Sequence, residues 1–422
     1  MAAIFLILLM VQIPRQVKEF DECNGLKYVY WIILAGHELV AFVNSYFSPV
    51  IGAHVDAVRF HHNAAELSHG GEFDLGVGVV FYENALGFIY SLFGPSLFLG
   101  CQISILAFSV SCIVFIKILK LLEITSSRAF LLFLYGGLPS VILIGSVTLR
   151  ESLELALFML VVYFTLRVAF SSMKLLDYLL ALISAFAMGV MHDGLFMYSV
   201  GAIILITLIF LKKTIFRKTK KIDIKLGLVA CVLTGVFTLG ILYIKGASHH
   251  DTQTIKAFEN GELLRHVADY RRRNIEINPG RTTYGGYLDT ASAPTVGWGV
   301  INIYKNYQLR PFFWDITNPV DAYALFEVVL RMALLYYSMQ VWRQASGAKR
   351  ASFGILLIFY FSMTFMWAMG TTNYGTALRH HVITSWILVV LGGASMQKAL
   401  IERLSPFGSG LRECGKSLFL KK

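Results

Sequence analysis

The sequence predicts an all-α polytopic membrane helix bundle of about 11 transmembrane helices with a long external loop. Of its 422 residues, 56% are hydrophobic and 15% are charged, whereas a soluble domain carries roughly 25% charged residues. The mean hydropathy is +0.63. Apolar runs of about 20 residues recur, and a backbone in lipid must satisfy its own hydrogen bonds, so these runs indicate helices rather than barrel strands. We expect residues 1–422 to form a single integral membrane domain.

Eleven apolar runs are the expected spans. In chain order they lie near residues 2–13, 28–47, 96–116, 129–147, 152–170, 176–191, 195–211, 226–244, 320–340, 352–370 and 381–398. Pro139 lies inside the fourth run and is expected to kink or break it, because proline removes a helical hydrogen bond. Residues 80–93 have the pattern of an amphipathic helix that lies on the membrane surface.

Lysine and arginine residues predict the orientation of these spans. In the short connections they gather on one side, which the positive-inside rule makes cytoplasmic, together with the C-terminal tail. That side includes Arg15, Lys18, Lys27, Lys117, Lys120, Arg128, Arg167, Lys174, the basic run 212–225, Arg343, Lys349 and Arg350. The net charge of +11 is therefore explained by topology, and no nucleic-acid partner is expected.

The external side receives two longer segments, residues 48–95 and 246–319, and short turns at 148–151, 192–194 and 371–381. In the first segment, Asp56, Arg59 and Asn63 share one face if the segment is helical. A carboxylate beside a cation stays ionised and can accept a proton. The alternatives are a solvated helix with an incidental ion pair, or a metal site formed with Asp56 by His54, His61 and His62.

Arg150 and Glu151 reach the outer membrane boundary about three turns after Pro139. Neighbouring residues on a helix do not face one another, so each is expected to meet a partner on another helix. A guanidinium at this depth can bind a phosphate through two hydrogen bonds. The alternative is an arginine at a helix end that extends its charge to the interface.

A second candidate anion site lies where the last span begins. Arg379, His380 and His381 follow a turn that contains two glycines and an asparagine. A helix N-terminus adds about half a positive charge there, and the imidazoles can titrate. Anchoring at the membrane boundary is the alternative.

The neighbouring sequence predicts an environment or a partner for each of the remaining polar residues. Arg310 lies within an aromatic segment, 307–314, that is typical of a membrane interface, yet it is a further phosphate candidate. Arg271, Arg272 and Arg273 are expected to be solvated or to face headgroups. His192 and Asp193 either face the bundle or mark an ordinary turn. Arg331 lies inside a span, where Glu327 one turn earlier is its expected partner.

The order of these segments resembles bacterial membrane glycosyltransferases of the GT-C type and the Wzy-like oligosaccharide repeat-unit polymerases of surface polysaccharide assembly. The resembling pieces are Asp56 with Phe60 and Ala64, the stretches 138–140 and 149–151, Tyr307 with residues 310–314, and residues 375–379. Phosphate-loop, dinucleotide, HExxH and GxSxG motifs do not occur in the sequence.

This resemblance implies sugar transfer from a polyprenyl-phosphate- or pyrophosphate-linked saccharide at the external face of the bacterial cytoplasmic (inner) membrane. Asp56 would act as the base or position the acceptor, with Arg150 and Glu151 as further catalytic residues. The substrate-binding candidates are Arg59, Arg310, Arg379, His380 and His192. No cofactor is expected, although a divalent metal stays open. Other polysaccharide-assembly proteins are possible partners beside the lipid bilayer.

Two other functions compete with transfer. A transporter or flippase of an anionic lipid-linked sugar would use the same arginines as substrate contacts, and inverted repeats with paired broken helices would favour it. An acyltransferase or other modifier of surface glycans would need a catalytic histidine, for which His192 is the candidate.

Overall fold

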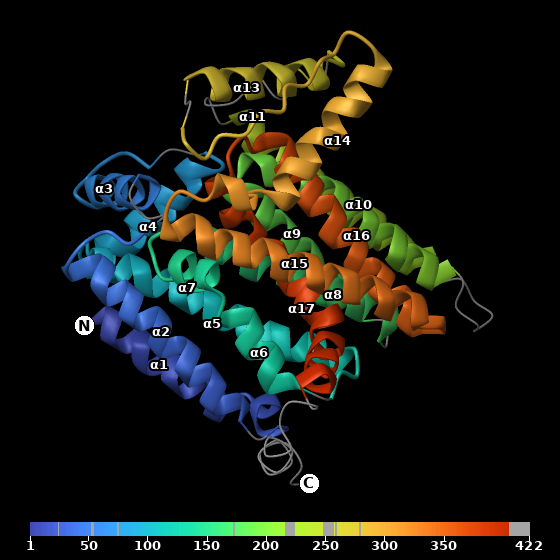
Figure 1. The fold of residues 1–422 in the computed structure, drawn as a ribbon, viewed down its shortest axis with the longest axis horizontal. Coiled ribbons are helices and arrows are strands. Elements are labelled where there is room, and N and C mark those ends of the chain that lie inside the picture. The colour runs from blue at the N-terminus through green and yellow to red at the C-terminus, as the bar shows by residue number, and fades with distance from the viewer. Residues whose placement is uncertain are drawn as a thin grey trace.

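The computed structural model describes residues 1–23, 25–51, 55–73, 76–125, 127–171, 174–215, 224–247, 257, 260–277 and 280–404. Within these ranges the regular structure is helical, apart from one isolated bridge between Thr283 and Asn373 (Figure 1). In this described part of the chain, eight helices are long and apolar enough to cross a membrane. They are α2 (Leu26–Tyr46), α5 (Leu97–Leu121), α8 (Glu151–Phe170), α10 (Asp193–Ile215), α11 (Ile224–Ala247), α15 (Pro319–Gln344), α16 (Gly347–Gly370) and α17 (Tyr374–Leu404). The predicted fold class is confirmed.

The remaining three predicted spans are helical but do not reach membrane length as single helices. α1 (Ala2–Gln16) has 15 residues and α9 (Leu175–Met191) has 17, and a 17-residue helix is only about 25 Å long. The fourth run is divided into α6 (Arg128–Gly136) and α7 (Pro139–Gly145), which are bent by 60°. In the described ranges the spans therefore number eight, or nine with the bent pair, rather than 11.

The bend begins at Pro139, as predicted, and a carboxylate from another helix stabilises it. Glu327 of α15 accepts hydrogen bonds from the backbone nitrogen of Ser140 at 2.8 Å and from its hydroxyl at 2.6 Å. The first N–H groups of a helix lack partners within it, so a buried carboxylate there compensates them. Arg331 instead donates to the carbonyl of Gln308 at 2.8 Å. The predicted partners Arg331 and Glu327 interact through their charges, but each side chain is hydrogen-bonded to a different backbone segment.

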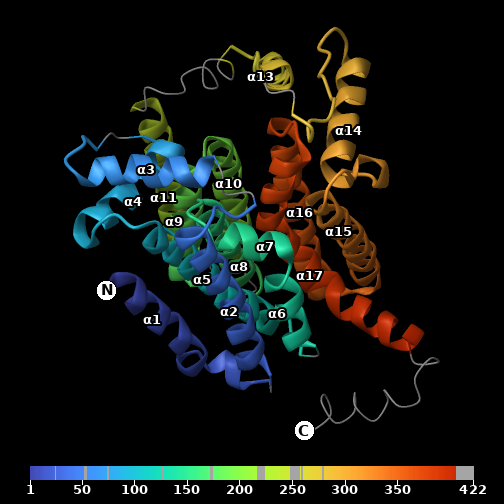
Figure 2. The same cartoon turned by 60° about the vertical axis from the view of Figure 1, so that its left-hand side comes forward.

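The central helix is α17, which packs against α15, α16, α8, α6 and α7. Two helical pairs lie at one end of the bundle: α3 (Asp56–Ser68) with α4 (Val79–Phe93), and α13 (Leu263–Ile277) with α14 (Ala293–Leu309) (Figures 1 and 2). Residues 80–93 are thus helical, as predicted.

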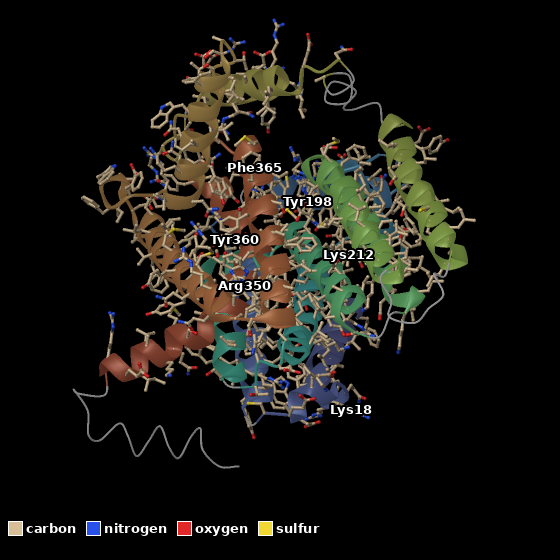
Figure 3. The ribbon with its side chains drawn as sticks, turned by 90° about the vertical axis from the view of Figure 1, so that its right-hand side faces the viewer. Lys18, Tyr198, Lys212, Arg350, Tyr360 and Phe365 are labelled. Carbon is tan, nitrogen blue, oxygen red and sulfur yellow. The ribbon has the colours of Figure 1, made fainter. Side chains whose placement is uncertain are left out.

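The opposite end carries the connections rich in lysine and arginine. Arg128 pairs with Glu22 at 2.8 Å and Arg167 with Asp177 at 3.1 Å, and Lys212 and Arg350 lie toward that end of α10 and α16 (Figure 3). The structure thus separates the two predicted sets of connections, and which set faces the cytoplasm stays a prediction from charge. The basic residues 217–221 and the tail residues Arg412, Lys416, Lys421 and Lys422 lie outside the described ranges.

Arg271 caps the end of α16. Its side chain is fully buried, and it donates to the carbonyls of Gly286 at 2.8 Å, Ala368 at 2.9 Å, Met369 at 3.1 Å and Thr371 at 2.7 Å. The last carbonyls of a helix need donors from outside it. The expectation that Arg271 is solvated is therefore wrong, whereas the exposed Arg272 pairs locally with Asp269 at 2.7 Å.

Replacing Arg271 by methionine should destabilise the protein by about 3 kcal/mol or more, because several buried carbonyls lose their donor at about 1–3 kcal/mol each. The matched control, Arg272→Met, should change stability by no more than about 0.5 kcal/mol. Thermal unfolding of the purified protein in detergent measures both. Equal midpoints for the two variants would show that Arg271 does not hold the end of α16.

Candidate active site

Arg379 joins three helices that are far apart in the sequence. Its Nη1 donates to Oδ2 of Asp56 at 2.7 Å and its Nε donates to Oε1 of Glu151 at 2.8 Å, while Nη2 binds the same Glu151 oxygen. Asp56 and Glu151 are the first residues of α3 and α8, where a helix N-terminus favours a carboxylate. Three of the predicted site residues therefore form one hydrogen-bonded unit.

More charged side chains surround this unit. Arg59 lies 3.5 Å from the other carboxylate oxygen of Asp56, and Arg150 lies 3.3 Å from Glu154. The Arg150 Nη1 also donates to the carbonyl of Met191 at the end of α9, at 3.5 Å. Together with Glu83 of α4, these residues form what we call the charge cluster: Asp56, Arg59, Glu83, Arg150, Glu151, Glu154 and Arg379.

The cluster keeps Asp56 ionised. Burial raises the pKa of its carboxyl, but the hydrogen bond and charge of Arg379, with Arg59 and Arg150, lower it further, so the pKa lies below its ordinary value. Glu83 differs, because burial raises its pKa above the ordinary range despite a hydrogen bond from Asn63 at 2.9 Å. Asp56 is therefore suited to accept a proton as a carboxylate, whereas the Glu83 carboxyl keeps its own proton to a higher pH.

Two buried acceptor atoms in the cluster accept no hydrogen bond, which is rare for buried polar atoms. They are Oε2 of Glu151 and Oε1 of Glu154, and the second of these still faces the Arg150 guanidinium at 3.3 Å as an ion pair. A shallow cavity of about 290 Å³ adjoins the cluster between α3 and α4, and its lining includes Asn63, Glu83 and Asn84. Carboxylates and amides of this kind can bind a hydroxylated ligand.

His192 and His380 meet through a tryptophan that sequence reasoning missed. The His380 ring stacks on Trp367 with centroids 3.8 Å apart, and the His192 ring meets Trp367 edge-on at 4.7 Å. His380 also bonds the hydroxyl of Thr371 at 3.0 Å, and His192 Nδ1 accepts from the backbone of Gly194 at 2.9 Å. His380 directly follows Arg379, so this aromatic group borders the charge cluster.

No family model matches the sequence, and no curated protein matches it. A solved structure, ArnT from Cupriavidus metallidurans bound to undecaprenyl phosphate, is similar with a TM-score of 0.48 and 10% identity. The similarity covers 89% of this chain and 63% of that one, so this chain spans less than two thirds of its length. The site described here rests on its own geometry.

Arg310 does not join the charge cluster. Its Nη1 lies 3.2 Å from both carboxylate oxygens of Asp315, within the turn η2 (Phe313–Asp315). Asp315 also accepts from the backbone of Phe312 at 2.8 Å, so the turn supplies a local partner. The structure thus separates Arg310 from the other predicted phosphate ligands.

In the described ranges, no group of three or more His, Cys, Asp or Glu side chains is placed to bind a metal, and the alternative metal site of Asp56 with His54, His61 and His62 stays a prediction. His61 bonds the hydroxyl of Tyr90 at 2.9 Å, and His62 lies 3.4 Å from Glu66. His54 lies outside the described residues.

Proposed function

We propose that the protein is a membrane glycosyltransferase or repeat-unit polymerase that uses a polyprenyl-phosphate-linked sugar donor at the external face for surface polysaccharide assembly. The observation that supports this proposal most is Arg379, held between Asp56 and Glu151 with Arg150 nearby. Such a site combines a base with cations for a phosphate, at the end of the bundle that carries α3, α4, α13 and α14.

The reaction follows from these groups. The acceptor hydroxyl oxygen forms a bond to the anomeric carbon while the bond from that carbon to the lipid-phosphate oxygen breaks. The hydroxyl proton passes to Asp56. The lipid phosphate or pyrophosphate leaves with the bonding electrons, and Arg379 and Arg150 stabilise its developing charge. The cavity beside Glu83 holds the acceptor sugar.

Arg379 must exchange one of its carboxylate partners for the donor phosphate before sugar transfer can occur. Both carboxylates compete with the donor phosphate for its guanidinium, and Asp56 is the more accessible, at 31% side-chain exposure against 4% for Glu151. The donor phosphate therefore displaces Asp56 from Arg379, while Glu151 keeps the guanidinium in place. The released Asp56 then accepts the proton.

The lipid bilayer and a lipid-linked saccharide are the proposed partners, in the bacterial inner membrane with a cytoplasmic C-terminus, and other polysaccharide-assembly proteins can join them. The proposed chemistry needs no cofactor. A flippase is less well supported, because the described ranges contain one bent helix pair and not the two matched broken helices of many transporters.

The test is genetic and biochemical. Deleting the gene should shorten the surface glycan to single repeats if the protein is a polymerase, or remove one sugar if it transfers a monosaccharide. Complementation with Asp56→Asn, Arg150→Ala or Arg379→Ala should fail. Purified protein in detergent, where no membrane sides exist, should still form the glycosidic bond, whereas a flippase would form none. Full complementation by all three variants would contradict the proposed site.

A further inference from the structure

A second cavity lies on α14, apart from the charge cluster. It has a volume of about 400 Å³ and is lined by Tyr287, Asp289, Pro294, Thr295, Trp298, Gly299 and Asn302. Two of these side chains are large exposed aromatics: Trp298 is 72% exposed and Tyr287 is 55% exposed. The cavity therefore combines open ring faces with a carboxylate, a hydroxyl and an amide.

The walls of this cavity are fixed in place. A Cβ atom on Gly299 would lie 3.2 Å from the Leu288 side chain and 3.4 Å from the Tyr287 carbonyl, so glycine allows the loop to lie close against α14. Ser292 and Thr295 cap the start of α14 with reciprocal hydrogen bonds. A preformed wall of this kind loses little conformational entropy on binding.

Trp298 lies far along α14 from the aromatics predicted at the membrane interface. Phe313 and Trp314, which the sequence predicts to be interfacial, follow the far end of α14, and the 11 steps from Trp298 to Leu309 rise about 17 Å along the helix at 1.5 Å per residue. Figure 2 shows α14 rising away from α15 and above the bundle. With Phe313 and Trp314 at the predicted interface, Trp298 is expected beyond the aromatic belt.

The loop that carries Tyr287 is tied to the start of α17. The backbone nitrogen of Tyr284 donates to Thr372 at 2.9 Å, and that of Tyr374 donates to Thr282 at 3.1 Å. Tyr287 lies three positions after Tyr284, at most about 11 Å along the chain. Arg379 lies five residues after Tyr374 on α17, about 7.5 Å along the helix. A short backbone connection therefore links the cavity lining to the helix that carries Arg379.

We propose that this cavity binds a stretch of the acceptor saccharide and guides the growing chain toward Arg379. Flat indole and phenol faces stack on the C–H faces of sugar rings, while Asp289, Thr295 and Asn302 bond the hydroxyls. Its volume falls in the range of small-ligand sites, about 300–1,000 Å³. The lining holds one carboxylate and no cation, which disfavours a phospholipid headgroup. This inference rests on the proposed function for the identity of the ligand.

The test is saccharide binding by the full-length protein in nanodiscs. The probe is the source cells' own surface polysaccharide, cut by mild acid and fractionated into oligosaccharides. Trp298→Ala and Asn302→Ala should each raise Kd at least tenfold, while Trp314→Ala, an exposed aromatic outside the cavity, should leave it unchanged. In transfer assays Trp298→Ala should raise KM for long acceptors and preserve kcat.

The outcomes separate the two proposals. Asp56→Asn should still bind the oligosaccharide. A wild-type protein that forms no glycosidic bond but loses oligosaccharide binding in Trp298→Ala would remove the proposed function and keep the saccharide site. Normal binding by Trp298→Ala and Asn302→Ala overturns the site. It is also overturned if Trp298→Ala changes only the oligomeric state or only the attachment to vesicles that lack saccharide.

Discussion

Replacing Arg379 by glutamine should abolish sugar transfer and destabilise the fold, and adding Glu151→Gln should restore the stability but not the transfer. Arg379 is the cation that faces Glu151, whose side chain is only 4% exposed. Removing one partner of a buried ion pair leaves an uncompensated charge and costs about 3–5 kcal/mol. In the double variant, two neutral amides face each other and no charge is left unpaired.

Transfer should respond differently from stability. Losing one donor to a developing negative charge typically lowers kcat by about 10²–10³-fold, and the glutamine pair cannot replace the guanidinium. Thermal unfolding in detergent and a transfer assay with a lipid-linked donor measure the two effects separately. The control is Arg59→Gln. The Arg59 side chain is half-exposed and lies 3.5 Å from a carboxylate oxygen of Asp56. Solvent screens an exposed ion pair of this kind, so its loss should change stability little. A double variant that transfers at the wild-type rate would exclude Arg379 as a phosphate ligand.

The sequence predicted the components of this site, because charges at the boundary of an apolar run stand out. Asp56, Arg150, Glu151 and Arg379 were each expected at the same membrane face, and the structure brings them together. Pattern and spacing could not show which partners would meet. The contacts of Arg379 cross 228 and 323 positions in sequence, and only the packing of α17 against the rest of the bundle sets them.

The partners of three further arginines could not be predicted from the sequence. Arg310, Arg271 and Arg331 were interpreted from their position relative to the membrane, but each is bound by groups that a local pattern does not indicate. Arg310 pairs with Asp315 in a tight turn, Arg271 caps the end of α16, and Arg331 bonds the end of α14. Backbone carbonyls leave no mark in the sequence, so an arginine that caps a helix resembles one that binds a ligand.

Asp56→Asn should tighten the binding of a polyprenyl phosphate while lowering transfer by about 10²–10⁴-fold, the usual contribution of a general base. The carboxylate of Asp56 occupies Arg379 at 2.7 Å, so it competes with the incoming phosphate. An amide at this position competes weakly and cannot accept the proton. Equilibrium binding of the lipid phosphate and initial transfer rates measure the two effects. Glu402→Gln is the control and should change neither, because Glu402 lies near the end of α17, where its exposed side chain pairs with Lys398.

The pH dependence identifies which acid takes the proton. The pKa of Asp56 lies below its ordinary 3.8, so its pair with Arg379 is fully formed above that pH and is lost as the pH falls through the pKa of the folded protein. The stability gap between wild type and Asp56→Asn should therefore be constant from neutral pH down to about 4 and shrink below it. The acid limb of kcat/KM should lie in the same low range. A limb above the ordinary Glu value of 4.5 would instead indicate Glu83, whose pKa burial raises, and Asp56 would then serve only to hold Arg379.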